Sequence, residues 1–356
     1  MKKKISFLLL IVLVCSVFII VSTGCNSSNW KDKFDTSLPD LTDSKWQNTM
    51  DVDFAKIKDM QELYQAGWAP STHSKRKYEY WCDQMVNFSD KGVVIKSERK
   101  SNHICDICDK SEGVFTSGIE TRPVVREDKV GNDKNVGFTQ AFGYFEATVI
   151  VPRGSGMWSA FWLQSDATPQ VGNGGKDGCE VDVYESSFCH TNPTYTGQAI
   201  HYDAYDAPWY KMTDNVTKMP YNLYDGKAHK YALLWTPDRY VVYVDDTPVW
   251  ATNFGGVSQT AEFLRLTVEI RDAVYGPYGQ KIGIFENHLD DTNDFIIQSV
   301  RVYQNSDYVD SIKSISDFKD MKGLFTALTI VGCIIGAIVI GISILLIIKF
   351  KKNKKV

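Results

Sequence analysis

The sequence predicts an all-β protein, an antiparallel sandwich with one membrane-spanning helix at its C-terminal end. Beyond Tyr78, short segments of β-branched and aromatic residues alternate with Gly, Pro, Asn and Asp, which is the pattern of strands and turns. The chain contains no nucleotide-binding loop, no internal repeat and no alternation of helix and strand patterns. Many short strands in one run are typical of a sandwich of two antiparallel sheets.

The segments that carry the strand pattern follow one another along the chain. They are KGVVIKSE, YFEATVIVP, MWSAFWLQ, CEVDVYE, GQAIHYD, KYALLWTP, RYVVYVDD and DFIIQSVRVYQ. Before them, the segment FAKIKDMQELYQ, residues 54–65, is expected to form one short helix.

The N-terminal end predicts export. Lys2–Lys4 form a basic region and Ile5–Val21 an apolar run, so residues 1–25 are predicted to be a signal peptide. The motif STGC, which ends at Cys25, resembles a bacterial lipobox, with Ser22 at the position where an aliphatic residue is usual. Three outcomes stay open: lipidation of Cys25, cleavage of an ordinary signal peptide, or an uncleaved anchor.

The C-terminal end predicts a membrane span. Residues 324–348 carry no charge and are long enough for a hydrocarbon layer of roughly 30 Å. The basic tail, residues 349–356, would then stay cytoplasmic. A buried core helix is the alternative, although core helices are rarely apolar on every face at this length. Residues 306–323 would form a polar stalk, and the domain before them would lie at the cell surface.

Composition excludes one class of partner and leaves the cysteines open. A net charge of −4 over 356 residues argues against nucleic acid. The exported part carries Cys82, Cys105, Cys108, Cys179 and Cys189. The CDIC pair within it could be a zinc half-site or a redox pair, but no second CxxC completes a four-thiolate site. An oxidising exterior favours a structural disulfide, whose connectivity stays open.

Three acids, Glu180, Asp182 and Glu185, lie on one predicted strand, in GCEVDVYESSF. Because side chains alternate between the faces of a strand, the first two share a face opposite the neighbouring valines. Strict alternation would place Glu185 inside the core, where an unpaired carboxylate is costly. A β-bulge near Val183 or Tyr184 would return Glu185 to the face of the other two acids.

Three acids on one face can perform acid–base chemistry on a sugar. Two glutamates that lean inward can approach the ~5 Å carboxyl spacing of retaining glycosidases. Asp182 between them raises the cost of a second negative charge, so one glutamate keeps its proton near neutral pH. The alternatives are a solvated acidic strand edge or a site for a hard cation.

Aromatic residues and a histidine surround these acids in the sequence. In GMWSAFWLQ, Trp158 and Trp162 share a face across a small alanine, which makes a flat platform for a sugar ring unless both rings belong to the core. His201 could bond the substrate or a carboxylate, with a structural role as the alternative. Trp209 is a weaker candidate for a sugar contact, since packing on the domain is the favoured role of a loop aromatic.

These motifs resemble glycoside hydrolase family 16, the laminarinase-like β-glucanase group, over roughly residues 30–304. EVDVYE matches the E-x-D-x-x-E signature of its bulge-containing members. The other segments that look like family landmarks occur in the family's order: FDTSLPDLTDSKW as the opening strand, GVFTSGIETR, FGYFEATVIVPRGSGMWSAFWLQ, DGKAHKYALLWTPDRYVVYVDD, and SVRVYQ as the closing strand.

The resemblance implies a β-jelly-roll catalytic domain over residues 30–305, with a glycan cleft across its concave sheet. It also implies hydrolysis by double displacement with retention. Glu180 then looks like the nucleophile, Glu185 like the acid/base, and Asp182 like the residue that hydrogen-bonds the nucleophile and supports the proton cycle. The implied cleft residues are Trp158, Trp162 and His201. Internal cleavage of a β-1,3- or β-1,3/1,4-glucan is the expected activity, by a monomer.

Departures from the family pattern widen the range of substrates. VGNGGKDGC replaces a tryptophan-proline stretch before the first glutamate, Ser159 stands where a proline follows the first tryptophan, and Glu269 where an amide is common. β-Galactans therefore stay open. Many members bind a structural calcium through an aspartate in the closing strand, and in this chain Gln298 stands near that position. Neither a metal nor a cofactor is therefore expected.

Three other functions stay open beside hydrolysis. A transglycosylase would use the same machinery with a sugar hydroxyl in place of water. A glycan-binding lectin would keep the fold without needing both glutamates, and an adhesion module would need neither the acids nor the paired tryptophans.

Overall fold

The computed structural model describes residues 30–71, 76, 78–103, 110–126, 134–186, 192–271, 273–275, 281–288 and 290–352. The chain divides into two compact units, residues 1–36 and 37–356. In the first unit, the described residues form the short helix α2 (Trp30–Lys33). The predicted signal peptide, the CDIC pair and Cys189 lie outside the described residues.

One antiparallel sheet of seven strands carries the three acids. Its order is β15 (Lys211–Lys218), β14 (Tyr195–Tyr202), β13 (Glu180–Glu185), β12 (Met157–Gln164), β19 (Phe263–Ile270), β8 (Gly118–Glu120) and β2 (Ala69–Pro70). The strand with the acids therefore lies near the middle of its sheet, between the aromatic strand and the strand that carries His201.

A second antiparallel sheet of eight strands forms the other layer. Its order is β18 (Thr247–Thr252), β17 (Tyr240–Val244), β16 (Ala228–Trp235), β11 (Gly143–Ile150), β22 (Phe295–Asn305), β5 (Gly92–Ile95) and β4 (Val86–Ser89), and β1 (Trp46–Asp53) also pairs with β22. Smaller ladders are β3 (Tyr80–Trp81) with β7 (Gly113–Thr116) and β6 (Glu98–Lys100), β9 (Val124–Arg126) with β10 (Lys134–Val136), and β20 (Ala273–Tyr275) with β21 (Lys281–Gly283).

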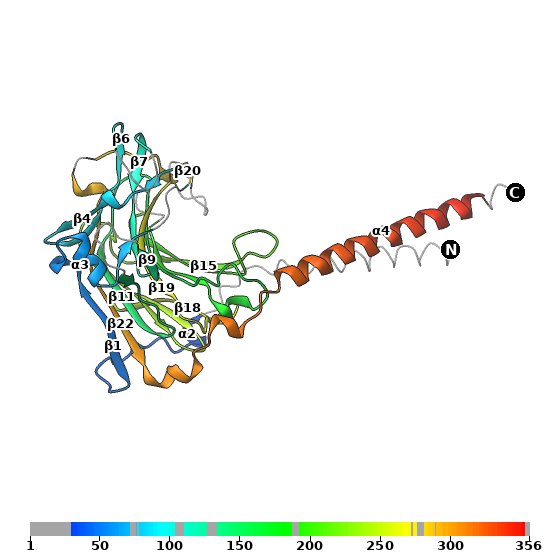
Figure 1. Ribbon diagram of the computed structural model, residues 1–356, viewed down its shortest axis with the longest axis horizontal. Coiled ribbons are helices and arrows are strands. Elements are labelled where there is room, and N and C mark those ends of the chain that lie inside the picture. The colour runs from blue at the N-terminus through cyan, green and yellow to red at the C-terminus, as the bar shows by residue number, and fades with distance from the viewer. Residues whose placement is uncertain are drawn as a thin grey trace. The chain divides into compact units, whose positions relative to one another are not determined.

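The core lies between the two large sheets. Val181 and Val183 of β13 are fully buried, as the strand pattern predicts. Tyr184 stacks on Tyr231 of β16 with 4.1 Å between ring centroids, so the two layers meet directly behind the acids. Figure 1 shows the strands of the two sheets layered on each other. The predicted sandwich of antiparallel sheets is confirmed.

Two local predictions are wrong. Residues 54–65 form a 3₁₀ turn (Phe54–Lys56) and a separate helix α3 (Met60–Gln65) instead of one helix. The reason is a second cap: the side chain of Asp53 accepts from the first turn, and that of Asp59 accepts from the backbone N–H of Glu62 and starts α3. The segment expected as the opening strand is irregular over residues 35–40 and forms turns over residues 41–45, and β1 begins only at Trp46.

The segment after the closing strand contacts the domain before the long C-terminal helix begins. It forms two 3₁₀ turns, Ser306–Ser311 and Ile315–Asp317, and the N–H of Lys313 donates to the carbonyl of Gln259. The expected polar stalk is therefore not a free linker. Helix α4 (Lys322–Lys352) follows, and within the described part of the chain it is the one helix long and apolar enough to cross a membrane (Figure 1).

Candidate active site

The three acids face the same side of the sheet because β13 contains a bulge. In β12, the residues paired with Glu180, Asp182 and Glu185 are Gln164, Trp162 and Ala160, which share one face of that strand. The register shifts at Val183, since Asp182 and Tyr184 pair with consecutive residues of β12. A matching shift separates Asp182 from Glu185 in the pairing with β14. The β-bulge that the sequence predicts is confirmed.

Glu185 is half-buried, at the C-terminal end of β13. Its carboxylate accepts a hydrogen bond of 2.7 Å from the indole Nε1 of Trp158. Burial raises the pKa of Glu185 to about 7, the negative charge of Asp182 adds to the rise, and the Trp158 hydrogen bond opposes it. A carboxylic acid with this pKa holds its proton near neutral pH, as a general acid requires.

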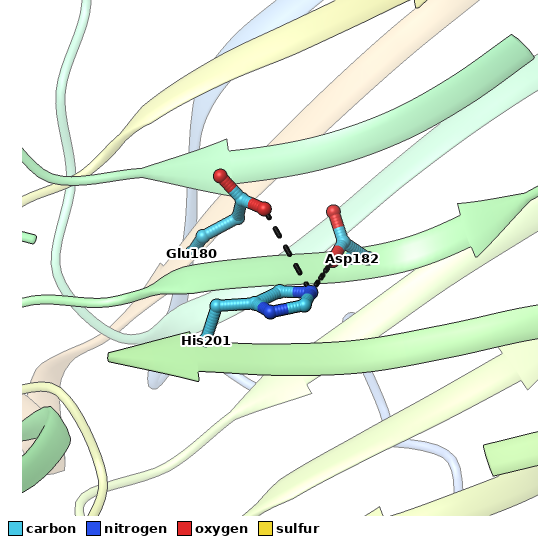
Figure 2. Close-up of side chains that lie close together, drawn as sticks. All are labelled: Glu180, Asp182 and His201. Carbon is cyan, nitrogen blue, oxygen red and sulfur yellow. Dashed lines mark ion pairs between the residues drawn. The ribbon is translucent and has the colours of Figure 1, made fainter. Parts of the chain in front are cut away.

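Asp182, which is buried, and His201, which is half-buried, form a pair next to Glu180. Figure 2 shows the imidazole of His201 extending from β14 toward both Glu180 and Asp182. Its Nε2 lies 3.1 Å from Asp182 Oδ2 and 3.8 Å from Glu180 Oε1. Burial lowers the pKa of His201, but the hydrogen bond and charge of Asp182 outweigh it and raise that pKa to about 9. The pKa of Asp182 is raised to about 6 by its own burial, with the charge of Glu180 second.

Glu180 is held by two further groups, neither of which was singled out from the sequence. The hydroxyl of Tyr205 donates to Glu180 Oε2 at 2.6 Å, and the amide of Gln164 donates to the same oxygen at 3.3 Å. Tyr210, from the same loop, bonds the Nδ1 of His201. The sequence signal for the two tyrosines was the number of aromatic residues in YDAPWYK, a segment in which only Trp209 was considered as a site residue.

The cluster has the spacing of a cation site. One ligand atom from each of Glu180, Asp182 and His201 lies within 4.8 Å of the others. Without a metal, the raised pKa of His201 favours the imidazolium, so a cation already lies beside the two carboxylates. A metal ion would have to displace that proton to bind the imidazole.

The two tryptophans do not form the open platform that the sequence predicts. Trp158 is only 5% exposed and Trp162 only 7% exposed. The guanidinium of Arg271 lies 4.2 Å from the ring centroid of Trp158, and that of Arg265 lies 4.2 Å from the ring centroid of Trp162. Each indole thus has a cation over its face.

The arginines belong to charged networks next to the acids. Arg265 is buried and pairs with the buried Glu120 at 2.9 Å, while its Nη1 donates to Gln164 Oε1 at 3.0 Å. Arg271 and Arg76 both pair with Glu269. Two guanidinium groups therefore share one carboxylate at the end of β19, beside the tryptophan that bonds Glu185.

Trp209 packs against the first turn of α4. Its ring stacks on Phe325, in the first turns of α4, with 5.8 Å between centroids and 24° between planes. Packing on the chain is the role favoured for this residue from the sequence, and the structure agrees with it.

Comparisons with known proteins give the same fold and family. A sequence model described as Glycosyl hydrolases family 16 matches residues 80–260, about half of the chain. The chain is similar to a β-glucanase of Rhodothermus marinus, with 28% identity over 106 residues that cover 30% of this chain and 36% of that protein. It is also similar to the endo-1,3-1,4-β-glycanase EglC of Rhizobium meliloti, with 30% identity over 115 residues that cover 32% of this chain and 21% of that protein.

The matches to these curated proteins thus span about a third and a fifth of their lengths. The fold is similar to that of the endo-β-1,3-glucanase from Pyrococcus furiosus, with a TM-score of 0.52, 17% identity, and coverage of 73% of this chain and 94% of that one. The family match includes all three acids and His201. The chain belongs to family 16 of the glycosyl hydrolases.

Proposed function

We propose that the chain is a retaining endo-β-glycosidase that hydrolyses a β-linked polysaccharide by double displacement. The observation that carries this proposal is the bulge at Val183, which puts Glu180, Asp182 and Glu185 on one face of one strand. It is supported by the unequal environments of the glutamates, because Glu185 has a pKa raised to about 7. Such a pair can supply a nucleophile and a proton donor at the same pH.

In the first step, a carboxylate oxygen of Glu180 attacks the anomeric carbon, and the bond to the glycosidic oxygen breaks. Glu185 gives its proton to that oxygen, so the leaving sugar departs as an alcohol. In the second step, Glu185 takes a proton from water, which attacks the anomeric carbon and releases Glu180. The imidazolium of His201 lies near both Glu180 and Asp182, so its positive charge reduces the repulsion between the two carboxylates.

A β-1,3- or β-1,3/1,4-glucan is the leading substrate. This choice is supported by the curated relatives, whose names describe a β-glucanase and an endo-1,3-1,4-β-glycanase. An endo-β-galactosidase is the second candidate, and the half-buried Arg271, which lies over Trp158, favours it. A guanidinium offers hydrogen bonds to hydroxyl and acidic groups, whereas a neutral glucan stacks best on a bare ring. A transglycosylase would use the same residues with a sugar hydroxyl as acceptor.

Azide rescue assigns the two glutamates. With an activated β-glycoside, Glu180→Ala should lose turnover and recover it in azide with an α-glycosyl azide as product. Glu185→Ala should recover with a β-glycosyl azide, because its nucleophile remains. Glu146→Gln, which changes a buried glutamate of the other sheet, is the matched control and should keep wild-type turnover. Full activity of Glu180→Ala would reject the proposal, and binding without turnover by the wild type would indicate a lectin.

A substrate panel separates the candidates. Laminarin, lichenan, agarose and carrageenan differ in linkage and in charge, and the sizes of the products show whether cleavage is internal. New products longer than the substrate would indicate transglycosylation.

We also propose that α4 anchors the domain at the cell surface, with residues 1–25 as the export signal and the basic residues after the helix on the inner side. The proposal is supported by the uncharged length of the helix, whose side chains are exposed along most of the apolar stretch. Release of an active domain from intact cells by external protease is the expected result. Recovery of the full chain in the soluble fraction without detergent would reject it.

A further inference from the structure

The segment that joins the catalytic domain to α4 is tied to the loop just before the acid strand. The backbone N–H of Met321 donates to the carbonyl of Val171 at 2.8 Å, and the N–H of Val171 donates to Asp320 Oδ1 at 3.2 Å. The side chain of Asn173 donates to the carbonyl of Lys319 at 2.9 Å. Residues 319–325, which we call the junction, thus dock on residues 171–173.

The contact is close enough to require a glycine. Gly172 has a φ of +102°, and a Cβ built on it would lie 2.7 Å from Met321 Cβ and 2.9 Å from Phe325 Cε2. A side chain at this position would meet both the strain of the left-handed region and the junction. The backbone N–H of Gly172 also donates to Asp203 Oδ1 at 2.9 Å, which links the docking site to the next loop.

That next loop, residues 203–210, presents two tyrosines to the acid cluster. Tyr205 donates to Glu180, and Tyr210 bonds His201. Between them, the N–H groups of Trp209 and Tyr210 both donate to the carbonyl of Asp206 and form one turn. The position of the Trp209 ring is therefore coupled to that of the Tyr210 hydroxyl.

The middle of this loop faces solvent. Residues 205–208 are exposed, whereas the Trp209 ring is half-buried against Phe325. Phe325 is itself half-buried, and its neighbours Leu324 and Thr326 are exposed. The ring contact adds to the hydrogen bonds that hold the loop through Asp203, Tyr205 and Tyr210, and it restrains the exposed part between them.

We propose that the junction is a positioning element of the active site: by holding residues 203–210 through Trp209 and Phe325, it keeps Tyr205 on Glu180 and Tyr210 on His201. The proposal rests on the proposed function, since it assigns Glu180 as the group to be positioned. Trp209 and Phe325 act through other residues and touch no reacting atom. The membrane helix and the catalytic centre are then linked through two adjacent residues, Trp209 and Tyr210.

The test compares full-length variants in detergent micelles. Phe325→Ala and Trp209→Ala should each slow trapping of Glu180 by an activated 2-deoxy-2-fluoro-β-glycoside about threefold to tenfold, the range expected for loss of one aromatic pair. Amide exchange in residues 203–210 should rise in the same variants. Trp209→Phe should restore the trapping rate, because it keeps an aromatic ring on Phe325.

Leu328→Ala, farther along α4 at a position 57% exposed, is the matched control and should change neither measurement. Trapping and exchange at wild-type levels in Phe325→Ala would overturn the proposal. A wild-type chain that the reagents never label would instead reject the proposed function. In that case, amide exchange in residues 203–210 would still test whether the junction orders the loop. Unchanged exchange in Phe325→Ala would overturn the positioning role of the junction.

Discussion

Replacement of Trp158 by phenylalanine removes the one hydrogen bond described for the Glu185 carboxylate while it keeps an aromatic ring under Arg271. The donor is the indole Nε1, 2.7 Å from Glu185 Oε1. A hydrogen bond to the ionised form of a carboxylate lowers its pKa, so its loss must raise the pKa of Glu185. The starting point is a pKa already raised to about 7 by burial.

The size of the shift follows from the energy of such a bond. A hydrogen bond to a charged group contributes roughly 1.5–3 kcal/mol, and 1.36 kcal/mol corresponds to one pKa unit. The basic limb of the kcat/KM profile should therefore move up by about one to two pH units in Trp158→Phe. Activity above pH 8 would then rise relative to activity at pH 6.

The control is Trp162→Phe. Its indole donates to the hydroxyl of Thr267 at 2.9 Å and not to a carboxylate, so the basic limb should stay in place. The measurement is kcat/KM on one soluble substrate from pH 4 to pH 10. A basic limb that stays put or moves down in Trp158→Phe would refute the assignment of Glu185 as the group that must be protonated.

Three further predictions concern buried charges. Asp182→Asn should lower the pKa of His201 from about 9, because it removes the hydrogen bond and charge that raise it, and an imidazole titration by NMR that still ends near pH 9 would contradict this. Glu262→Gln should raise the melting temperature more at pH 9 than at pH 5. Burial raises the pKa of Glu262 to about 8, so between the unfolded pKa and pH 8 the native state binds one proton more than the unfolded state. The wild-type protein therefore loses stability as pH rises through that window, and the glutamine variant does not. An equal change at both pH values would argue against it. Arg265→Met should cost about 3–5 kcal/mol in denaturant unfolding, because Glu120 is left as a buried charge without its partner, and a cost below about 1 kcal/mol would contradict this.

The acid strand could be predicted because its signals are local. Alternation in β13 fixes which residues face the core, and the cost of burying Glu185 then demands one extra residue in the strand. Both conditions act within six residues, so no knowledge of the partner strands was needed. The strands with β-branched or aromatic cores were found for the same reason.

The surroundings of the acids depend on pairing between distant segments, which the sequence does not encode locally. Arg265 lies directly opposite Trp162 in the register of β12 and β19, and Tyr205 reaches Glu180 from a loop. Strand β15 was missed because KMTDNVTK has no apolar alternation. It is an edge strand with exposed or half-exposed residues throughout, so propensity alone gives no signal there.

Because residues 319–321 dock on Val171 and α4 begins at Lys322, no flexible linker separates the sandwich from the helix. A flexible tether lets an enzyme search a volume that grows with tether length. Anchored in a bilayer through α4, this domain would instead work at a fixed short height above the lipid. Only polysaccharides that come close to the membrane would then reach the active site. The enzyme would cleave chains already bound at the surface of its own cell rather than chains that diffuse at a distance.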